Sequence, residues 1–178
     1  MHSSDHLIIA HRTFSSRLFI GTGKFSQVAI MAAAIRESET QLVTVALRRM
    51  DLGDPHDEFL ESIDPKKILL VPNTSGARDA REAVKLSQLA RAAGSESWIK
   101  LELTPEPRHL LPDPIETLIA AELLVKEGFT VLPYINADPV LAKKLEDVGC
   151  AAVMPLGSPI GSNRGVETKE MIRIIIEN

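Results

Sequence analysis

The sequence predicts an α/β fold and, within that class, a (β/α)8 (TIM) barrel of which this chain covers about the first six β/α units. Apolar runs alternate with helical stretches at intervals of about 20 to 35 residues, which favours parallel strands joined by right-handed crossovers. A doubly wound open sheet fits the same alternation. A lysine and a glutamate that face inward from a middle strand favour the barrel, because alternate residues of each barrel strand point into its interior. A complete barrel needs about 250 residues, so residues 1–178 correspond to about three quarters of one, in a single incomplete domain.

Short apolar runs mark the predicted strands. The run at 42–47 is apolar almost throughout, which is typical of a strand that is covered on both faces. The predicted strands cover residues 7–10, 17–20, 42–47, 68–71, 98–103, 130–134 and 150–154.

Capping residues mark the helices between these strands. Asp113 and Asp138 each precede a proline, which predicts an N-cap aspartate with proline at the first helical position. Ser26 is the expected N-cap of the first helix, whose buried stripe is expected to begin at Val28. Glycines are expected to end three of the helices, at positions 94, 128 and 149. The predicted helices cover about 26–37, 78–93, 114–127 and 139–148, and a last one begins near 167.

The stretch 98–103 carries the candidate chemistry. Its odd-numbered residues are apolar, whereas Trp98, Lys100 and Glu102 share the other face of the strand. A lysine beside its own carboxylate in a pocket suits a nucleophile, because an amine that is partly withdrawn from water can lose its proton and attack a carbonyl. An edge strand with a solvated polar face explains the same pattern equally well.

Composition limits the classes of function. A hydrophobic fraction of 44%, a charged fraction of 25% and a net charge of −4 are those of an ordinary globular protein and argue against general nucleic-acid binding. The single cysteine excludes an intramolecular disulfide and fits a reducing compartment. No run of about 18 apolar residues and no signal-peptide pattern appears, so we expect a cytoplasmic protein without a membrane partner.

Several other residues invite functional interpretations that we consider weaker. Lys24 follows a Gly-Thr-Gly turn whose spacing does not match a Walker A loop, so we expect it to be solvated. Arg48 and Arg49 end a predicted strand and either clamp an anion or lie in solvent. Cys150 is expected to be a small core residue and not a sulfur relay. The histidines, at positions 2, 6, 11, 56 and 109, lack metal-ligand spacing, and we expect neither a metal nor a cofactor.

Six stretches, in chain order, carry a resemblance to thiazole synthase of bacterial thiamine biosynthesis. They are GTGKF at 21–25, PNTSG at 72–76, WIKLE at 98–102, LPDPIETL at 111–118, VLPY at 131–134 and VMPLGSPIGS at 153–162. The resemblance extends from about residue 7 to residue 178. It implies a (β/α)8 barrel enzyme, a sulfur-incorporating transferase that forms the thiazole phosphate of thiamine.

The family resemblance also implies substrates and site residues. The substrates are 1-deoxy-D-xylulose 5-phosphate, dehydroglycine (from glycine or tyrosine) and sulfur from the C-terminal thiocarboxylate of a ubiquitin-like carrier protein. Within the matched motifs, the Schiff-base lysine falls on Lys100 and the acid–base glutamate on Glu102. Gly161 matches a phosphate contact, and Gly157 lies in the same turn. A homo-oligomer is expected.

The family pattern continues with a seventh and an eighth strand, which carry an acid–base aspartate and further phosphate-binding backbone. Neither strand lies within residues 1–178, so we expect this stretch alone not to turn over substrate. Two other functions fit Lys100 and a phosphate loop: a different Schiff-base barrel enzyme, such as a class I aldolase, and a non-catalytic barrel scaffold.

Overall fold

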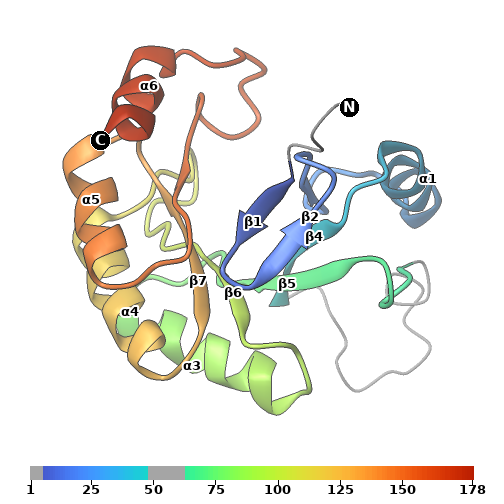
Figure 1. Ribbon diagram of the computed structural model, residues 1–178, viewed down its shortest axis with the longest axis horizontal. Helices are drawn as coiled ribbons and strands as arrows, with labels where there is room; N and C mark the ends of the chain where they lie inside the picture. The colour runs from blue at the N-terminus through green and yellow to red at the C-terminus, as the bar shows by residue number, and fades with distance from the viewer. Residues whose placement is uncertain (1–5, 48–62) are drawn as a thin grey trace.

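The computed structural model describes residues 6–47 and 63–178, which form a curled, parallel six-stranded sheet preceded by a short hairpin (Figure 1). The hairpin pairs β1 (Leu7–Ile9) with β2 (Arg12–Phe14) in antiparallel fashion. The sheet runs in chain order from β3 to β8, each strand parallel to the one before it. Its strands are β3 (Ile20–Gly21), β4 (Leu42–Ala46), β5 (Leu69–Asn73), β6 (Trp98–Leu101), β7 (Thr130–Ile135) and β8 (Met154–Pro155). The predicted parallel α/β architecture is therefore confirmed, as part of a barrel.

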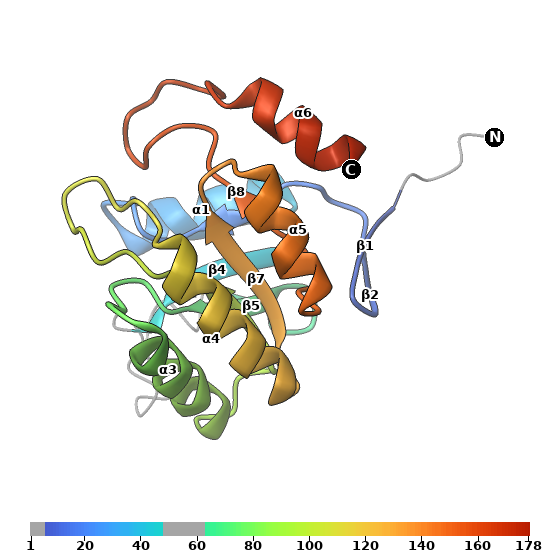
Figure 2. The same cartoon turned by 90° about the vertical axis from the view of Figure 1, so that its left-hand side faces the viewer.

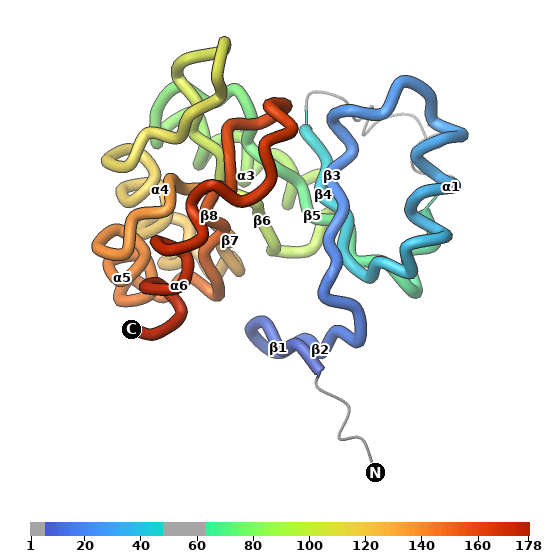
Figure 3. The backbone as a smooth tube through the Cα atoms, turned by 90° about the horizontal axis from the view of Figure 1, so that it is seen from above, coloured from blue at the N-terminus to red at the C-terminus, as the bar shows by residue number. Residues whose placement is uncertain are grey.

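Helices lie on the outer side of this curved sheet, as the view from above shows (Figure 3). They are α1 (Val28–Ser38), α3 (Ala80–Ala92), α4 (Pro114–Lys126), α5 (Pro139–Asp147) and α6 (Lys169–Glu177). The Asp113 carboxylate accepts hydrogen bonds from two amides of the first turn of α4, and Asp138 does the same for α5, so both predicted N-caps are confirmed. Positive φ angles confirm the three predicted helix-ending glycines, at positions 94, 128 and 149. No helix in the described ranges is both long and apolar enough to cross a membrane.

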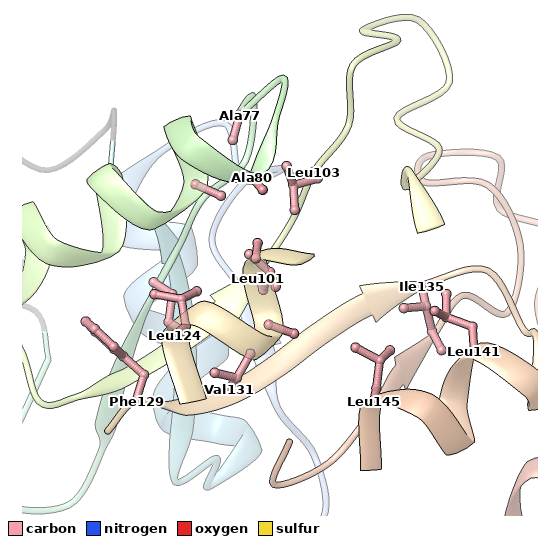
Figure 4. Close-up of a cluster of buried hydrophobic side chains, with 14 of the residues drawn as sticks. Ala77, Ala80, Leu101, Leu103, Leu124, Phe129, Val131, Ile135, Leu141 and Leu145 are labelled. Carbon is pink, nitrogen blue, oxygen red and sulfur yellow. The ribbon is translucent and has the colours of Figure 1, made fainter. Parts of the chain in front are cut away.

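The main hydrophobic core fills the space between the sheet and α3, α4 and α5 (Figures 2 and 4). Strand β6 contributes its odd-numbered residues to this outer layer, and β7 contributes Val131 and Ile135. The facing helix residues are Ala80, Ala83, Ala120, Ala121, Leu124, Leu141, Ala142 and Leu145. Alanines let the helices approach the sheet closely, and the fully buried leucines fill the remaining volume.

A second core lies on the inner side of the sheet, near the start of the strands. Phe14 of the hairpin is almost fully buried, and its ring makes edge-to-face contacts with Phe19 and with Trp98 of β6. The first residues of β4 and β5 and Leu132 of β7 belong to the same cluster. The hairpin therefore closes the amino-terminal end of the sheet interior with apolar side chains.

Three local predictions were wrong. Gln27, not Ser26, is the N-cap residue of α1, without a side-chain hydrogen bond, and Val28 is exposed. Residues 17–19 of the predicted strand 17–20 lie outside any strand, since β3 begins only at Ile20. The strand that follows β1 is the hairpin strand β2. Strand β8 begins at Met154, although the amide of Ala151 already donates to the carbonyl of Val131. Arg48, Arg49 and most of the loop that follows them lie outside the described residues.

Candidate functional site

Strand alternation brings the candidate residues to the inner face of the sheet, at the carboxyl end of β6. Lys100 lies beside Asn73 of β5 and Leu132 of β7 in the register of the sheet. Because Ile99 and its odd-numbered neighbours face the helices, Lys100 and Glu102 face the interior, above the buried Trp98. The interior is thus apolar at the amino end of the strands and polar at the carboxyl end, where barrel enzymes carry their active sites.

Lys100 and Glu102 form a partly buried ion pair. The Lys100 Nζ lies 2.8 Å from the Glu102 Oε1, and their side chains are 19% and 8% exposed. Charges that are withdrawn from water at this level require a partner, and each of these residues supplies it to the other. The edge-strand alternative is excluded, because β6 lies between β5 and β7 and its lysine side chain is largely buried, with 19% exposed.

Thr74 fixes the backbone that carries this pair. Its hydroxyl donates to the carbonyl oxygen of Glu102 at 2.9 Å and accepts from the amide of Glu102 at 2.8 Å. The amide of Thr74 in turn donates to the carbonyl oxygen of Lys100 at 3.2 Å. The sequence did not single out Thr74 as a positioning residue. The signal that could have identified it is a hydroxyl side chain directly after a buried strand.

Tyr134 is a second residue that the sequence did not single out. It lies on β7 with a buried side chain, and its ring centroid is 6.0 Å from the Lys100 Nζ. Burial, and then the negative charge of Glu102, raise the pKa of the Tyr134 phenol. The site therefore contains an amine, a carboxylate and a neutral phenol within one interior.

The loop that follows β8 carries both predicted phosphate-site glycines. The Ser158 hydroxyl donates to the carbonyl oxygen of Gly165 at 2.8 Å, which folds the loop back on itself. Gly161 adopts a φ of +79°, which glycine adopts without strain. Gly157 lies against this closure, since a Cβ added there would meet the Gly165 oxygen at 3.3 Å. The Nζ of Lys24, from the turn after β3, is 3.7 Å from where a Cβ of Gly161 would lie.

Cys150 packs against the main core beside α5 and is partly buried. Burial raises the pKa of its thiol to about 12, so the unreactive thiol form predominates near neutral pH. Within residues 6–47 and 63–178, no three His, Cys, Asp or Glu side chains are grouped as metal ligands would be.

Comparison with known proteins gives close relatives along nearly the whole chain. Thiazole synthase 2 of Syntrophotalea carbinolica is 66% identical over 173 residues, which cover 97% of this chain and 67% of the relative. Thiazole synthase of Syntrophobacter fumaroxidans is 66% identical over 171 residues, with coverage of 96% and 67%. This chain therefore spans about two thirds of the length of these relatives.

A solved structure supports the fold. The crystal structure of the Amycolatopsis orientalis BexX/CysO complex contains a chain that superimposes with a TM-score of 0.82 at 26% identity, over 97% of this chain and 70% of that one. The family model described as thiazole biosynthesis protein ThiG matches residues 8–178. The chain belongs to the ThiG family of thiazole biosynthesis proteins.

Proposed function

We propose that this protein is a thiazole synthase that forms a Schiff base between Lys100 and 1-deoxy-D-xylulose 5-phosphate. The observation that carries the proposal is the Lys100–Glu102 ion pair at the carboxyl end of β6, inside the sheet. A lysine in this position presents an amine to a substrate that enters from the open end. The carboxylate of Glu102, 2.8 Å from the Lys100 Nζ, lies close to the carbons of a substrate bound to that nitrogen.

In the proposed reaction, the free amine of Lys100 attacks the ketone carbon, and loss of water leaves an iminium. The positive charge of the iminium acidifies the neighbouring C3–H bond, and Glu102 accepts that proton. Return of a proton to C2, with loss of the C3 hydroxyl proton, leaves an amine at C2 and moves the carbonyl to C3. A positioned proton-transfer group of this kind typically contributes ~10²–10⁴-fold to the rate. The thiocarboxylate sulfur then replaces the oxygen of the migrated carbonyl, and that oxygen leaves on the carrier as its C-terminal carboxylate. Dehydroglycine closes the ring: its nitrogen takes the place of Lys100 on the sugar carbon, the lysine amine is released, and a further water is lost from the sugar chain.

The loop after β8 supplies the proposed phosphate site. Gly161 takes a turn conformation and has no side chain of its own to cover its backbone, so a phosphate can approach its amides closely. Gly157 lies at the closure of the same loop. In a parallel sheet the carboxyl ends of β6 and β8 lie at one rim, so a single ligand can reach both the loop and Lys100.

A protein partner is the proposed source of sulfur. The structural relative belongs to a crystal structure of a complex, BexX/CysO, which supports a docking role for this fold. We propose that a ubiquitin-like carrier delivers its thiocarboxylate to the carboxyl end of the strands. A cytoplasmic location and a homo-oligomeric assembly remain predictions.

Borohydride trapping tests the proposal. The protein is incubated with 1-deoxy-D-xylulose 5-phosphate, reduced with cyanoborohydride and digested, and the modified lysine is located by mass spectrometry. We expect one adduct, on Lys100, which the Lys100→Met variant loses. The matched control is Lys126→Met, because Lys126 also pairs with a glutamate at 2.7 Å but lies exposed on α4. Trapping on another lysine, or no trapping at all, would refute the proposal.

Glu102 is tested separately, through the proton that it moves. In D2O, the wild-type protein should exchange the C3 hydrogen of the bound ketose, which NMR detects as loss of that proton signal. Glu102→Gln should still trap ketose on Lys100 but should exchange C3 at least about a hundredfold more slowly. Equal exchange by the two proteins would remove Glu102 from the proposed reaction.

A further inference from the structure

The hydroxyl of Tyr134 is a buried polar group without a hydrogen-bond partner among the described residues. Buried hydroxyls in native proteins are nearly always satisfied, and an unsatisfied one requires an explanation. Phenylalanine would fill the same space without this unfavourable contribution. The hydroxyl therefore lowers stability in the ligand-free protein, which indicates a partner that arrives later.

The position of Tyr134 identifies where that partner lies. Leu132, two residues before it, belongs to the inner core and pairs in register with Lys100. Tyr134 therefore faces the interior one step closer to the carboxyl end, while Val131 and Ile135 face the helices. The 6.0 Å between its ring centroid and the Lys100 Nζ agrees with this placement.

A ketose bound to Lys100 comes within reach of this hydroxyl. Bond lengths of about 1.3–1.5 Å put the first carbons of an imine-linked ketose, with their oxygens, within about 4 Å of the lysine nitrogen. The phenol oxygen lies at the edge of a ring whose centroid is 6.0 Å from the Lys100 Nζ, so such a ligand occupies the same part of the interior as the hydroxyl. Of the two register neighbours of Lys100, Leu132 has no polar atom in its side chain, and the side-chain oxygen of Asn73 already accepts a hydrogen bond from the Ser75 amide at 3.1 Å.

The protonation state of the phenol suits a donor. Its pKa is raised from its usual value near 10, first by burial and then by the Glu102 charge. The phenol is therefore neutral across the physiological range and carries a proton that it can donate.

We propose that Tyr134 contacts the substrate: its phenol donates a hydrogen bond to an oxygen of the ketose held on Lys100. This inference rests on the proposed function, because it needs a ketose at Lys100. A neutral hydrogen bond of this kind is worth roughly two- to tenfold in affinity.

Tyr134→Phe tests the contact, because it removes one oxygen and keeps the ring. We expect borohydride trapping of 1-deoxy-D-xylulose 5-phosphate still to occur on Lys100, but at a half-saturating concentration roughly two- to tenfold higher. Because the hydroxyl is unsatisfied without ligand, we expect the unfolding temperature of the variant to be unchanged or raised. Unchanged trapping would overturn the inference. A lowered unfolding temperature would do so too, since it would show that the hydroxyl has a structural partner.

Thr117→Val is the matched control. The Thr117 hydroxyl is also buried without a partner in the part of the chain that the structure describes, but it lies on α4, outside the sheet interior. Its removal should likewise leave the unfolding temperature unchanged or raised, and trapping on Lys100 should stay at the wild-type level. A loss of trapping equal to that of Tyr134→Phe would assign both effects to general repacking and overturn the inference.

A direct measurement separates this inference from the proposed function. The sequence contains one tyrosine, so the phenolate absorbance at 295 nm reports on Tyr134 alone. Donation to a bound ketose should move the phenol titration to higher pH in the presence of 1-deoxy-D-xylulose 5-phosphate. If the wild-type protein traps nothing on Lys100, the proposed function fails and this inference fails with it. If the protein traps ketose on Lys100 but saturating ketose leaves the phenol titration unchanged, the inference alone is overturned.

Discussion

Removal of one partner of the Lys100–Glu102 pair is expected to leave an isolated charge in the sheet interior. The Lys100→Met variant retains a carboxylate that is 8% exposed, and breaking a buried pair in this way costs about 3–5 kcal/mol. We expect about 3 kcal/mol for Lys100→Met. For Glu102→Gln we expect about 2 kcal/mol, because the remaining lysine is 19% exposed and reaches water more easily. For a chain of this length, 3 kcal/mol corresponds to a fall in unfolding temperature of about 6–12 °C.

A double-mutant cycle isolates the pairwise contribution. The two single variants and the Lys100→Met/Glu102→Gln double variant are unfolded in urea at pH 7, and their unfolding free energies are compared with that of the wild type. The double variant removes both charges, so it should lose about 2–3 kcal/mol in place of the roughly 5 kcal/mol of the summed single losses. The coupling free energy should therefore be about 2–3 kcal/mol.

The exposed pair on α4 serves as the control for this cycle. Lys126 Nζ and Glu122 Oε1 are 2.7 Å apart, closer than the interior pair, but their side chains are 68% and 51% exposed. The same substitutions there should couple by about 0.3–0.5 kcal/mol. If the interior pair couples no more strongly than this exposed pair, then burial does not strengthen it and the account of the site is wrong.

Three further predictions concern the surroundings of the pair. Thr74→Val should lower the unfolding free energy by about 1–3 kcal/mol and slow trapping on Lys100, because the backbone amide and carbonyl of Glu102 lose their hydrogen-bond partner. Thr74→Ser keeps the hydroxyl and should retain the wild-type stability and trapping rate. Equal stability and trapping of the two variants would contradict the positioning role of Thr74. Cys150 should react slowly with iodoacetamide until the pH approaches 12, the raised pKa of its thiol. The unfolding free energy should fall as the pH rises above about 9, because there the thiol ionises in the unfolded chain but not in the folded protein. Cys150→Ala should abolish that pH-dependent loss and leave thiazole formation largely intact, whereas loss of all turnover with the fold retained would restore the sulfur-relay alternative. Gly161→Ala and Gly94→Ala each force a side chain onto a positive φ and should cost about 1 kcal/mol, but only Gly161→Ala should weaken binding of the phosphorylated ketose, measured by calorimetry.

The sequence predicts the frame of the fold well because its signals are local. Asp113 and Asp138 cap their helices through their own first-turn amides, so the residues that decide each boundary are adjacent in the chain. The β6 alternation also survives folding, with Ile99 and Leu101 toward the helices and Lys100 toward the interior, although the strand ends at Leu101 and not at the predicted 103. Local pattern is sufficient wherever one element's own residues determine its boundary or its buried face.

Where the prediction failed, the deciding contacts are distant in sequence. The hairpin strand β2 is polar apart from Phe14, whose burial depends on Trp98 of β6, 84 residues later. Thr74 and Tyr134 belong to the site only because β5 and β7 flank β6. Neither residue carries a pattern in its own strand that distinguishes it from an ordinary buried threonine or tyrosine.

The distribution of polarity inside the sheet argues that the site exists for its chemistry and not for stability. Replacement of a buried ion pair by apolar side chains of similar volume is often neutral or stabilising, so an interior built only for stability would continue the apolar layer of Phe14 and Trp98 upward. Instead, the next layer contains the Lys100–Glu102 pair and the unsatisfied hydroxyl of Tyr134, each of which stabilises the fold less than an apolar residue would. These groups lie together at the carboxyl end of the strands, the end at which a barrel receives its ligand. A ligand that pairs with Lys100, Glu102 and the Tyr134 hydroxyl stabilises the complex by satisfying groups that are poorly satisfied in the free protein. The trapping experiments measure the binding of such a ligand.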